Sequence, residues 1–327
     1  MLYYIVSFLL IVSVNESIVF AQKLSKSEND FSLQEKLVIG NKEKNLLLEA
    51  SSVVQASSGE ILVSDKLNYS IKKFDNLGNK IVEVGKRGRA NSEFRGPNAL
   101  DVYKDIIAAA DFASSRVQIF TIDFKHLKTF YAPGPIHDLA FDPNGKLWLG
   151  VLTDTKGKNL FQYDIDGKQL KHISLKNSKE DVFDNMFSFV ISNSGKIAIV
   201  YNYFNKIEIW DIHSNFITEY VVEGVIASAK KKTISTGLFS KIDLPLGIVF
   251  QDVAVDNKEN IFILSSDYST NQYRDVYVYN TNGKYVYRFT LLAKASQVWI
   301  NQQGELFTIE NKRTIVKKYR LNNFSKK

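Results

Sequence analysis

The chain of 327 residues contains no cysteine, and this absence removes several kinds of chemistry. Without a thiol there is no disulfide bond, no cysteine nucleophile and no lipid-modified N-terminal cysteine. The chain has only four histidines. A zinc centre built on histidine needs several of them on one metal, so the sequence offers little for such a site. We find neither a paired nucleophile and base nor a phosphate-binding glycine loop. We therefore expect no catalytic residues of these kinds.

The first 14 residues form an apolar run that is too short to span the roughly 30 Å hydrocarbon core of a membrane. Asn15-Glu16-Ser17 interrupts the run, and Val19-Phe20-Ala21 resembles the small-residue site that precedes signal-peptide cleavage. We predict a signal peptide over residues 1–21, a disordered leader over 22–33, and a periplasmic or secreted protein without a stable membrane anchor. The absence of Lys and Arg from residues 1–21 leaves an uncleaved anchor as the alternative.

The composition favours β structure in one large domain. Hydrophobic residues make up 45% of the chain, and 16 Tyr and 22 Phe are typical of strands with packed faces. The formal net charge of +7 favours acidic partners only mildly. We expect a single all-β domain over residues 34–327.

Turns recur along that domain in two series. The first series closes a hairpin in each unit at 57–59, 104–105, 143–145, 193–195, 258–260 and 302–304. The second follows an aromatic residue at the end of a third strand: Phe74, Phe120, Tyr163, Trp210, Tyr279 and Tyr319. These aromatics lie 40 to 47 residues apart except for one interval of 69, which places an insertion at 224–250. Six units with a period in the forties predict a six-bladed β-propeller of four-stranded blades.

The last unit lacks its outer strand, because only eight residues follow Tyr319. An unmatched strand at 34–40 precedes the first unit. We predict that this N-terminal strand completes the last blade and closes the ring, since an exposed edge would otherwise remain.

The first units carry motifs that resemble the NHL repeat. They are Gly85-Lys86-Arg87-Gly88, Glu93 to Pro97, Ile107 to Asp111, and Arg116-Val117-Gln118-Ile119-Phe120. The resemblance is strong in the first third of the chain and elsewhere rests on turns and aromatics. It implies a six-bladed propeller used mostly as a binding platform, with a few lyase and lactonase relatives.

Counting back from the hairpin turns predicts a polar ring where the inner strands begin. Its members are Ser52, Asn98, Asp138, Ser188, Asp252 and Gln297. Asn98, Asp138 and Asp252 offer oxygen ligands for a weak divalent cation such as Ca²⁺; we expect no other cofactor. The alternative, favoured because two carboxylates are few for Ca²⁺, is that these residues cap strand ends. Asp65 and Asp111 are likewise expected to accept hydrogen bonds from backbone, and Arg116 to pair locally.

The loops that join second to third strands are rich in aromatics, and the insertion is rich in lysine. Both sets are expected on the face that carries the blade-to-blade connections. We predict a partner-binding surface there, made by Tyr69, Phe112, Tyr201, Tyr203, Phe204, Tyr268, Tyr273, Lys230, Lys231 and Lys232. The alternative is that the insertion simply packs on the propeller rim.

Two functions remain open at this point. The first is an exported, non-catalytic, monomeric propeller that binds a protein, peptide or glycan. The second is a metal-dependent hydrolase of lactonase type that uses Asn98, Asp138 and Asp252. Nucleic-acid binding fits the charge but conflicts with the predicted signal peptide, so we expect no nucleic-acid partner.

Overall fold

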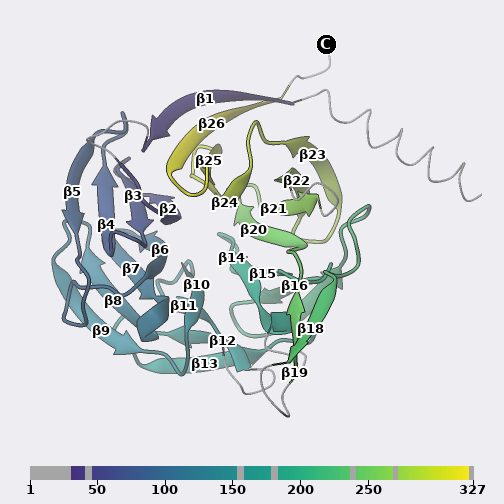
Figure 1. Cartoon of the computed structure of the whole chain (residues 1–327), viewed down its shortest axis with the longest axis horizontal. Coiled ribbons are helices and arrows are strands. Elements are labelled where there is room, and N and C mark those ends of the chain that lie inside the picture. Colours follow the sequence, from purple (N-terminus) through teal and green to yellow (C-terminus); the bar gives the residue numbers. More distant parts are fainter. Residues whose placement is uncertain are drawn as a thin grey trace, which may run out of the picture.

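The computed structural model describes residues 31–40, 46–152, 158–177, 183–235, 241–267 and 272–323. The signal peptide and most of the leader predicted from the sequence lie outside these residues. Six four-stranded antiparallel sheets surround a central axis, and a separate two-stranded hairpin lies at the rim (Figure 1). The predicted six-bladed β-propeller is therefore confirmed.

Within each blade the strands follow one another from the centre outward. The inner strands are β2 (Ala50–Gln55), β6 (Pro97–Tyr103), β10 (Ile136–Phe141), β14 (Phe187–Ile191), β20 (Phe250–Val255) and β24 (Ala295–Ile300). The second strands are β3 (Ile61–Asp65), β7 (Ile106–Asp111), β11 (Leu147–Val151), β15 (Lys196–Tyr201), β21 (Asn260–Asp267) and β25 (Glu305–Glu310).

The outer half of each blade is built in the same way. The third strands are β4 (Ser70–Phe74), β8 (Arg116–Thr121), β12 (Lys158–Tyr163), β16 (Ile207–Asp211), β22 (Gln272–Asn280) and β26 (Ile315–Asn323). The fourth strands are β5 (Lys80–Val84), β9 (His126–Tyr131), β13 (Gln169–Ser174), β17 (Phe216–Tyr220), β23 (Tyr285–Thr290) and β1 (Phe31–Ile39). Among the described residues, two short 3-10 helices, Phe112–Ser114 and Phe183–Asn185, lie in loops. No helix in the described ranges has the length and apolar character needed to cross a membrane.

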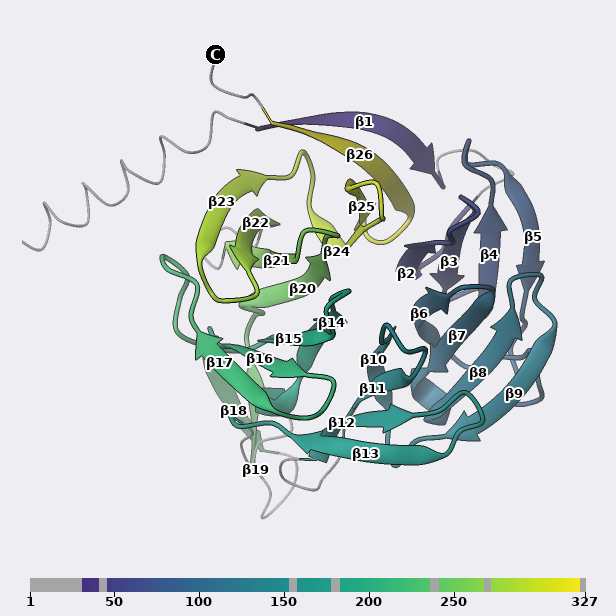
Figure 2. The ribbon, with the colours of Figure 1, turned by 180° about the vertical axis from the view of Figure 1, so that it is seen from behind.

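The ring closes through the N-terminal strand. β1 pairs antiparallel with β26, so the last sheet has the order β1-β26-β25-β24, as Figure 2 shows from behind. The strand begins at Phe31, three residues before the predicted start, and a register shift between Glu35 and Leu37 separates its two halves. Ile39 at its end is fully buried in the cluster between the last and first blades. The predicted closure is confirmed.

Turn chemistry explains why the units repeat. After the third strand of the first blade, Asp75 Oδ1 accepts hydrogen bonds from the backbone N–H groups of Leu77 (2.9 Å) and Asn79 (2.8 Å). Gly78 follows with a φ of +83°, which a residue without a Cβ adopts at little cost. The same side-chain pattern recurs where the corresponding Asp or Asn follows the aromatic in later blades.

The core lies between neighbouring blades. Every residue of β3 and of β11 is buried, because each second strand is covered on both faces by the adjoining sheets. Such strands read as continuous apolar runs rather than as alternating patterns. The outer strand β5, by contrast, has four exposed residues of five. The second strands are therefore enclosed between blades, whereas the outer strands face solvent at the rim.

Candidate functional site

Five of the six inner strands begin with a β-bulge. The register against the second strand shifts by one residue in β2, β6, β10, β20 and β24, but not in β14. The residues at the bulge are Ser51, Asn98, His137, Gln251 and Ser296. A bulge rotates the residues on either side of it relative to a regular strand, so it decides which side chain faces the channel.

Three of the five bulge side chains, those of Ser51, Asn98 and Gln251, reach the next blade as hydrogen-bond donors. Ser51 Oγ donates to the carbonyl of Pro97 (2.7 Å), and Gln251 Nε2 donates to that of Ser296 (3.2 Å). In the fourth blade, which has no bulge, Asn202 Nδ2 donates to the carbonyl of Phe250 (2.9 Å) instead. The starts of neighbouring inner strands are thereby joined.

A second ring of hydrogen bonds runs through the residues that follow the bulges. Each side chain accepts a backbone N–H from the inner strand of the next blade. The pairs are Ser52 with Leu100 (3.1 Å), Asp138 with Phe189 (3.0 Å), Asp252 with Val298 (2.9 Å) and Gln297 with Val53 (3.0 Å). All four acceptors belong to the polar ring predicted from the sequence, and their observed contacts are those of capping groups.

Asn98 lies one position away from the place the sequence predicted. Because Asn98 occupies the bulge, Ala99 pairs with Ala110 and takes the position equivalent to Asp138. The Asn98 amide donates to the carbonyl of Ile136 (3.0 Å), and its oxygen accepts the N–H of Phe112 (2.9 Å). Its polar atoms are thus engaged between blades, and it is not among the residues that line the central cavity.

Asp101 takes part in the channel although sequence counting missed it. Its Oδ2 accepts the N–H of Phe141 at 2.7 Å, one pleat further along the strand than the other acceptors. Strand alternation places Asp101 on the same face as Ala99, so a period of two along β6 was the signal that would have found it.

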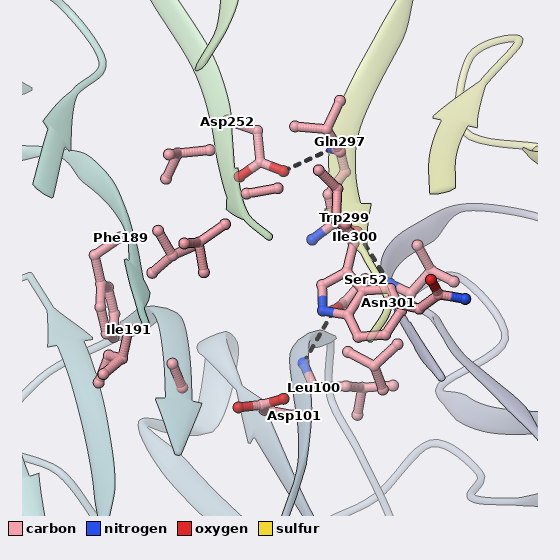
Figure 3. A pocket seen from close by; sticks show the side chains of 18 of the residues that line it. Ser52, Leu100, Asp101, Phe189, Ile191, Asp252, Gln297, Trp299, Ile300 and Asn301 are labelled. Carbon is pink, nitrogen blue, oxygen red and sulfur yellow. Dashed lines mark hydrogen bonds between the residues drawn. The ribbon is translucent and has the colours of Figure 1, made fainter. Parts of the chain in front are cut away.

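The central cavity has a volume of about 230 Å³ and extends along the inner strands. It runs from Ser52 and Asp138 to the first hairpin turns at Asn193, Asn257 and Gln302. In Figure 3, Asp101 and Asp252 enter it from different blades, between apolar side chains such as Phe189 and Ile191. The cavity therefore combines carboxyl and amide side chains with apolar ones in its wall.

Burial raises the pKa of three carboxyls that border the cavity, those of Asp101, Asp138 and Asp252. It raises the pKa of Asp101 to about 6 and the pKa of Asp138 to about 7, against opposing hydrogen bonds from backbone N–H groups. The pKa of Asp252 also lies well above its usual range, through burial and then through the charge of Asp138. Burial of His137 lowers the pKa of its ring to about 4. The channel therefore favours neutral side chains.

The cation site expected at Asn98, Asp138 and Asp252 lacks a compact ligand set. Within the described ranges, no group of three or more His, Cys, Asp or Glu side chains is arranged to hold a metal ion. Asn98 is directed to backbone atoms, and Asp138 and Asp252 each accept an inter-blade N–H. Weak Ca²⁺ binding stays a prediction.

The aromatic residues predicted on the loop face fall into two groups. Phe112 is 38% exposed, Tyr69, Tyr203 and Tyr273 are partly exposed, and Tyr268 lies outside the described residues. Lys230, Lys231 and Lys232 are exposed, and Lys231 Nζ lies 2.8 Å from a carboxylate oxygen of Asp184. The described members of this group keep part of their surface exposed to solvent, and the partner surface stays a prediction.

Tyr201 and Phe204, in contrast, belong to the interior. Their rings stack with centroids 4.4 Å apart, and the Tyr201 hydroxyl donates to Glu208 at 2.8 Å. The insertion covers this loop, since Ser228 pairs with Phe204 and the N–H of Ala229 donates to the carbonyl of Tyr203. They therefore do not contribute to an exposed aromatic surface.

Comparison with solved structures identifies the same architecture elsewhere. A Bacteroides fragilis protein that is named for its expected export is 12% identical, with a TM-score of 0.62 over 92% of this chain and 97% of that one. Virginiamycin B lyase from Staphylococcus aureus is 13% identical, with a TM-score of 0.56 over 90% of this chain and 99% of that one.

The chain shares the fold of these propellers. The WD40 repeats of RRP9 also match, at 11% identity and a TM-score of 0.56 over 89% of this chain and all of that one. The sequence matches none of the family profiles and none of the curated proteins with which it was compared. At such identities the likeness extends to the fold alone, and the NHL resemblance is supported only as far as the propeller architecture.

Proposed function

We propose that this protein is an exported, non-catalytic propeller that binds a protein, peptide or glycan on its loop-rich face. The observation that carries the proposal is the hairpin inserted between the fourth and fifth blades, β18 (Lys231–Ser235) with β19 (Lys241–Pro245). It lies outside the six blade sheets, at the rim of the ring (Figure 1).

The base of the hairpin is fixed to the propeller by backbone hydrogen bonds. The N–H of Val249 donates to the carbonyl of Asn202 (2.7 Å), and that of Asn205 donates to the carbonyl of Ala227 (2.8 Å). At the base of the hairpin, the N–H of Leu246 donates to the carbonyl of Lys230 (2.7 Å). An insertion anchored in this way holds its strands in a defined place, which reduces the ordering cost of binding.

The hairpin also offers a surface that suits an anionic partner. β18 and β19 pair with each other and with no other described strand, and a strand edge of this kind can accept an added strand. The side chains of Lys230, Lys231 and Lys232 are exposed at its start, and Leu246 at its end is 60% exposed. Apolar surface beside positive charge is typical of interaction sites.

Export is the second part of the proposal. It is supported by the short apolar N-terminal run followed by Val19-Phe20-Ala21, and by the fold shared with a protein that is named for expected export. A chain without cysteine folds in an oxidising compartment without the risk of incorrect disulfides.

The test replaces residues 231–245 with a short Gly-Ser linker and retains the anchoring residues 221–230 and 246–249. We expect an unchanged melting temperature, since long surface insertions contribute little to stability, and at least a tenfold loss of binding on a glycan array and to periplasmic proteins. The control exchanges Lys125, Lys128 and Lys168, exposed elsewhere, for Gln. A hairpin-free chain that keeps every partner would contradict the proposal.

A further inference from the structure

A second cavity lies on the loop-rich face, between the segment that joins the first two blades and the turn between β7 and β8. Its volume is about 240 Å³. The lining residues are Arg89, Arg95, Ala113, Ser114, Arg116 and Tyr131. Three arginines therefore border one small space that contains no acidic lining residue.

Arg116 builds the framework of this cavity. It is 1% exposed, and its guanidinium donates to the carbonyls of Arg89 (2.6 Å) and Glu93 (2.5 Å). Its Nε lies 3.4 Å from Asp111 Oδ2, which also accepts the N–H of Arg95 at 3.0 Å. The local pairing predicted for Arg116 is confirmed, and it fixes the backbone from which Arg89 and Arg95 project.

Arg89 and Arg95 contribute charge that the protein does not neutralise. Both side chains are exposed, and in the described part of the chain neither has an ion-pair partner. The neighbouring carboxylates pair with other cations: Glu93 Oε1 lies 3.4 Å from Lys86 Nζ, and Asp111 Oδ2 lies 3.4 Å from Arg116 Nε. Two guanidinium groups held beside a third in this way form a receptor for an oxyanion.

Tyr131 supplies an aromatic wall beside these charges. It ends strand β9, pairs in register with Arg116, and is 66% exposed. An exposed ring combines an apolar face with a polar tip, so it accommodates a ligand that is itself part apolar and part polar. The flat apolar face of a sugar ring has this character.

We infer that this cavity binds one oxyanion-bearing sugar unit of an anionic glycan, either a uronate or a sulfated sugar. The guanidinium groups of Arg89 and Arg95 take the oxyanion through paired hydrogen bonds, and Tyr131 packs against the sugar ring. A volume of about 240 Å³ is below the usual range for drug-sized ligands and suits one compact unit rather than an extended peptide. The inference rests on the proposed function only in choosing a glycan as partner, because the β18–β19 hairpin takes no part.

The test is calorimetric titration of the full chain with glucuronate, glucose 6-sulfate, glucose, sodium sulfate and a tetraglutamate peptide. We expect binding of one or both anionic sugars, at least tenfold weaker in Arg89→Gln and in Arg95→Gln and weaker in Tyr131→Ala. Arg320→Gln, which removes the same charge from an exposed position on β26, should bind like the wild type. The uronate and sulfate arms distinguish the two sources of the oxyanion.

Three results would overturn the inference. They are no binding of either anionic sugar, wild-type affinity for the sugars in both arginine variants, or tighter binding of tetraglutamate than of the sugars. Sulfate alone binding as tightly as glucose 6-sulfate, with no effect of Tyr131→Ala, would overturn the sugar assignment. The variant without the hairpin should bind the anionic sugars normally. Failure of the sugar-binding inference is therefore distinguishable from failure of the function proposed for the β18–β19 hairpin.

Discussion

Replacing Asp138 with Asn should change how the stability of the propeller depends on pH. The carboxyl of Asp138 borders the central cavity and accepts N–H groups from Leu139 (2.9 Å) and Phe189 (3.0 Å). Burial raises its pKa from 3.8 to about 7, so the folded protein retains a proton that the unfolded chain has already lost. The stabilisation that comes from this retained proton is complete below about pH 4 and is lost as pH rises towards 7.

The size of the effect follows from this difference in proton affinity. A change from 3.8 to about 7 corresponds to about 4 kcal/mol, at about 1.4 kcal/mol for each tenfold change in affinity. Solvent that reaches the side chain through the cavity reduces this value, so we expect about 1–3 kcal/mol. Asn cannot ionise, and it loses one acceptor oxygen, which costs about 1 kcal/mol at every pH. The variant should therefore unfold with a lower free energy than the wild type at pH 4. This difference should shift in favour of the variant as the pH rises to 8.

The assay is urea unfolding of both proteins at pH 4 and at pH 8. The constant cost of the lost acceptor cancels when the two differences in unfolding free energy are compared. The control is Asp105→Asn, an exposed carboxylate between β6 and β7, for which the difference should stay constant within about 0.5 kcal/mol. An equally constant difference for Asp138→Asn would refute the argument that burial keeps this carboxyl protonated.

Four further predictions follow from the fold and the channel. Deleting β1, residues 31–39, should give insoluble protein or a sharply lower melting temperature, because it exposes the edge of β26 and removes the buried Ile39. Asp142→Ala should cost about 2–4 kcal/mol in urea unfolding, since its carboxylate accepts the indole N–H of Trp148 at 3.0 Å and organises a turn; Asp166→Ala, at an exposed turn, should cost less than about 1 kcal/mol. Millimolar Ca²⁺ should raise the melting temperature slightly in the wild type and not in Asp138→Ala, and equal curves with chelator would remove the cation site. Mass spectrometry of protein from its native host should find Gln22 at the N-terminus, and recovery of intact Met1 in membranes would indicate an anchor.

The sequence by itself determined the propeller and its closure. Turn residues such as Asp75 and Gly78 act through hydrogen bonds and backbone angles within a few residues, so their positions mark the turns directly. The count of six units and the missing outer strand then left residues 34–40 as the strand that closes the ring, and β1 pairs with β26 as that count required.

Tertiary structure alone decided which side chains face the channel and which remain exposed. Asn98 occupies the bulge of β6, so Ala99 takes the position that Asp138 holds in β10. Asn98 therefore left the predicted ring while Asp101 entered the cavity. Phe204 is buried where Ser228 of the insertion pairs with it, whereas Tyr201 is buried because it ends the second strand β15 within the core between blades. The first outcome depends on where the bulge falls in the pairing of β6 with β7, and the second on contacts of the loop with other blades and with an insertion further along the chain.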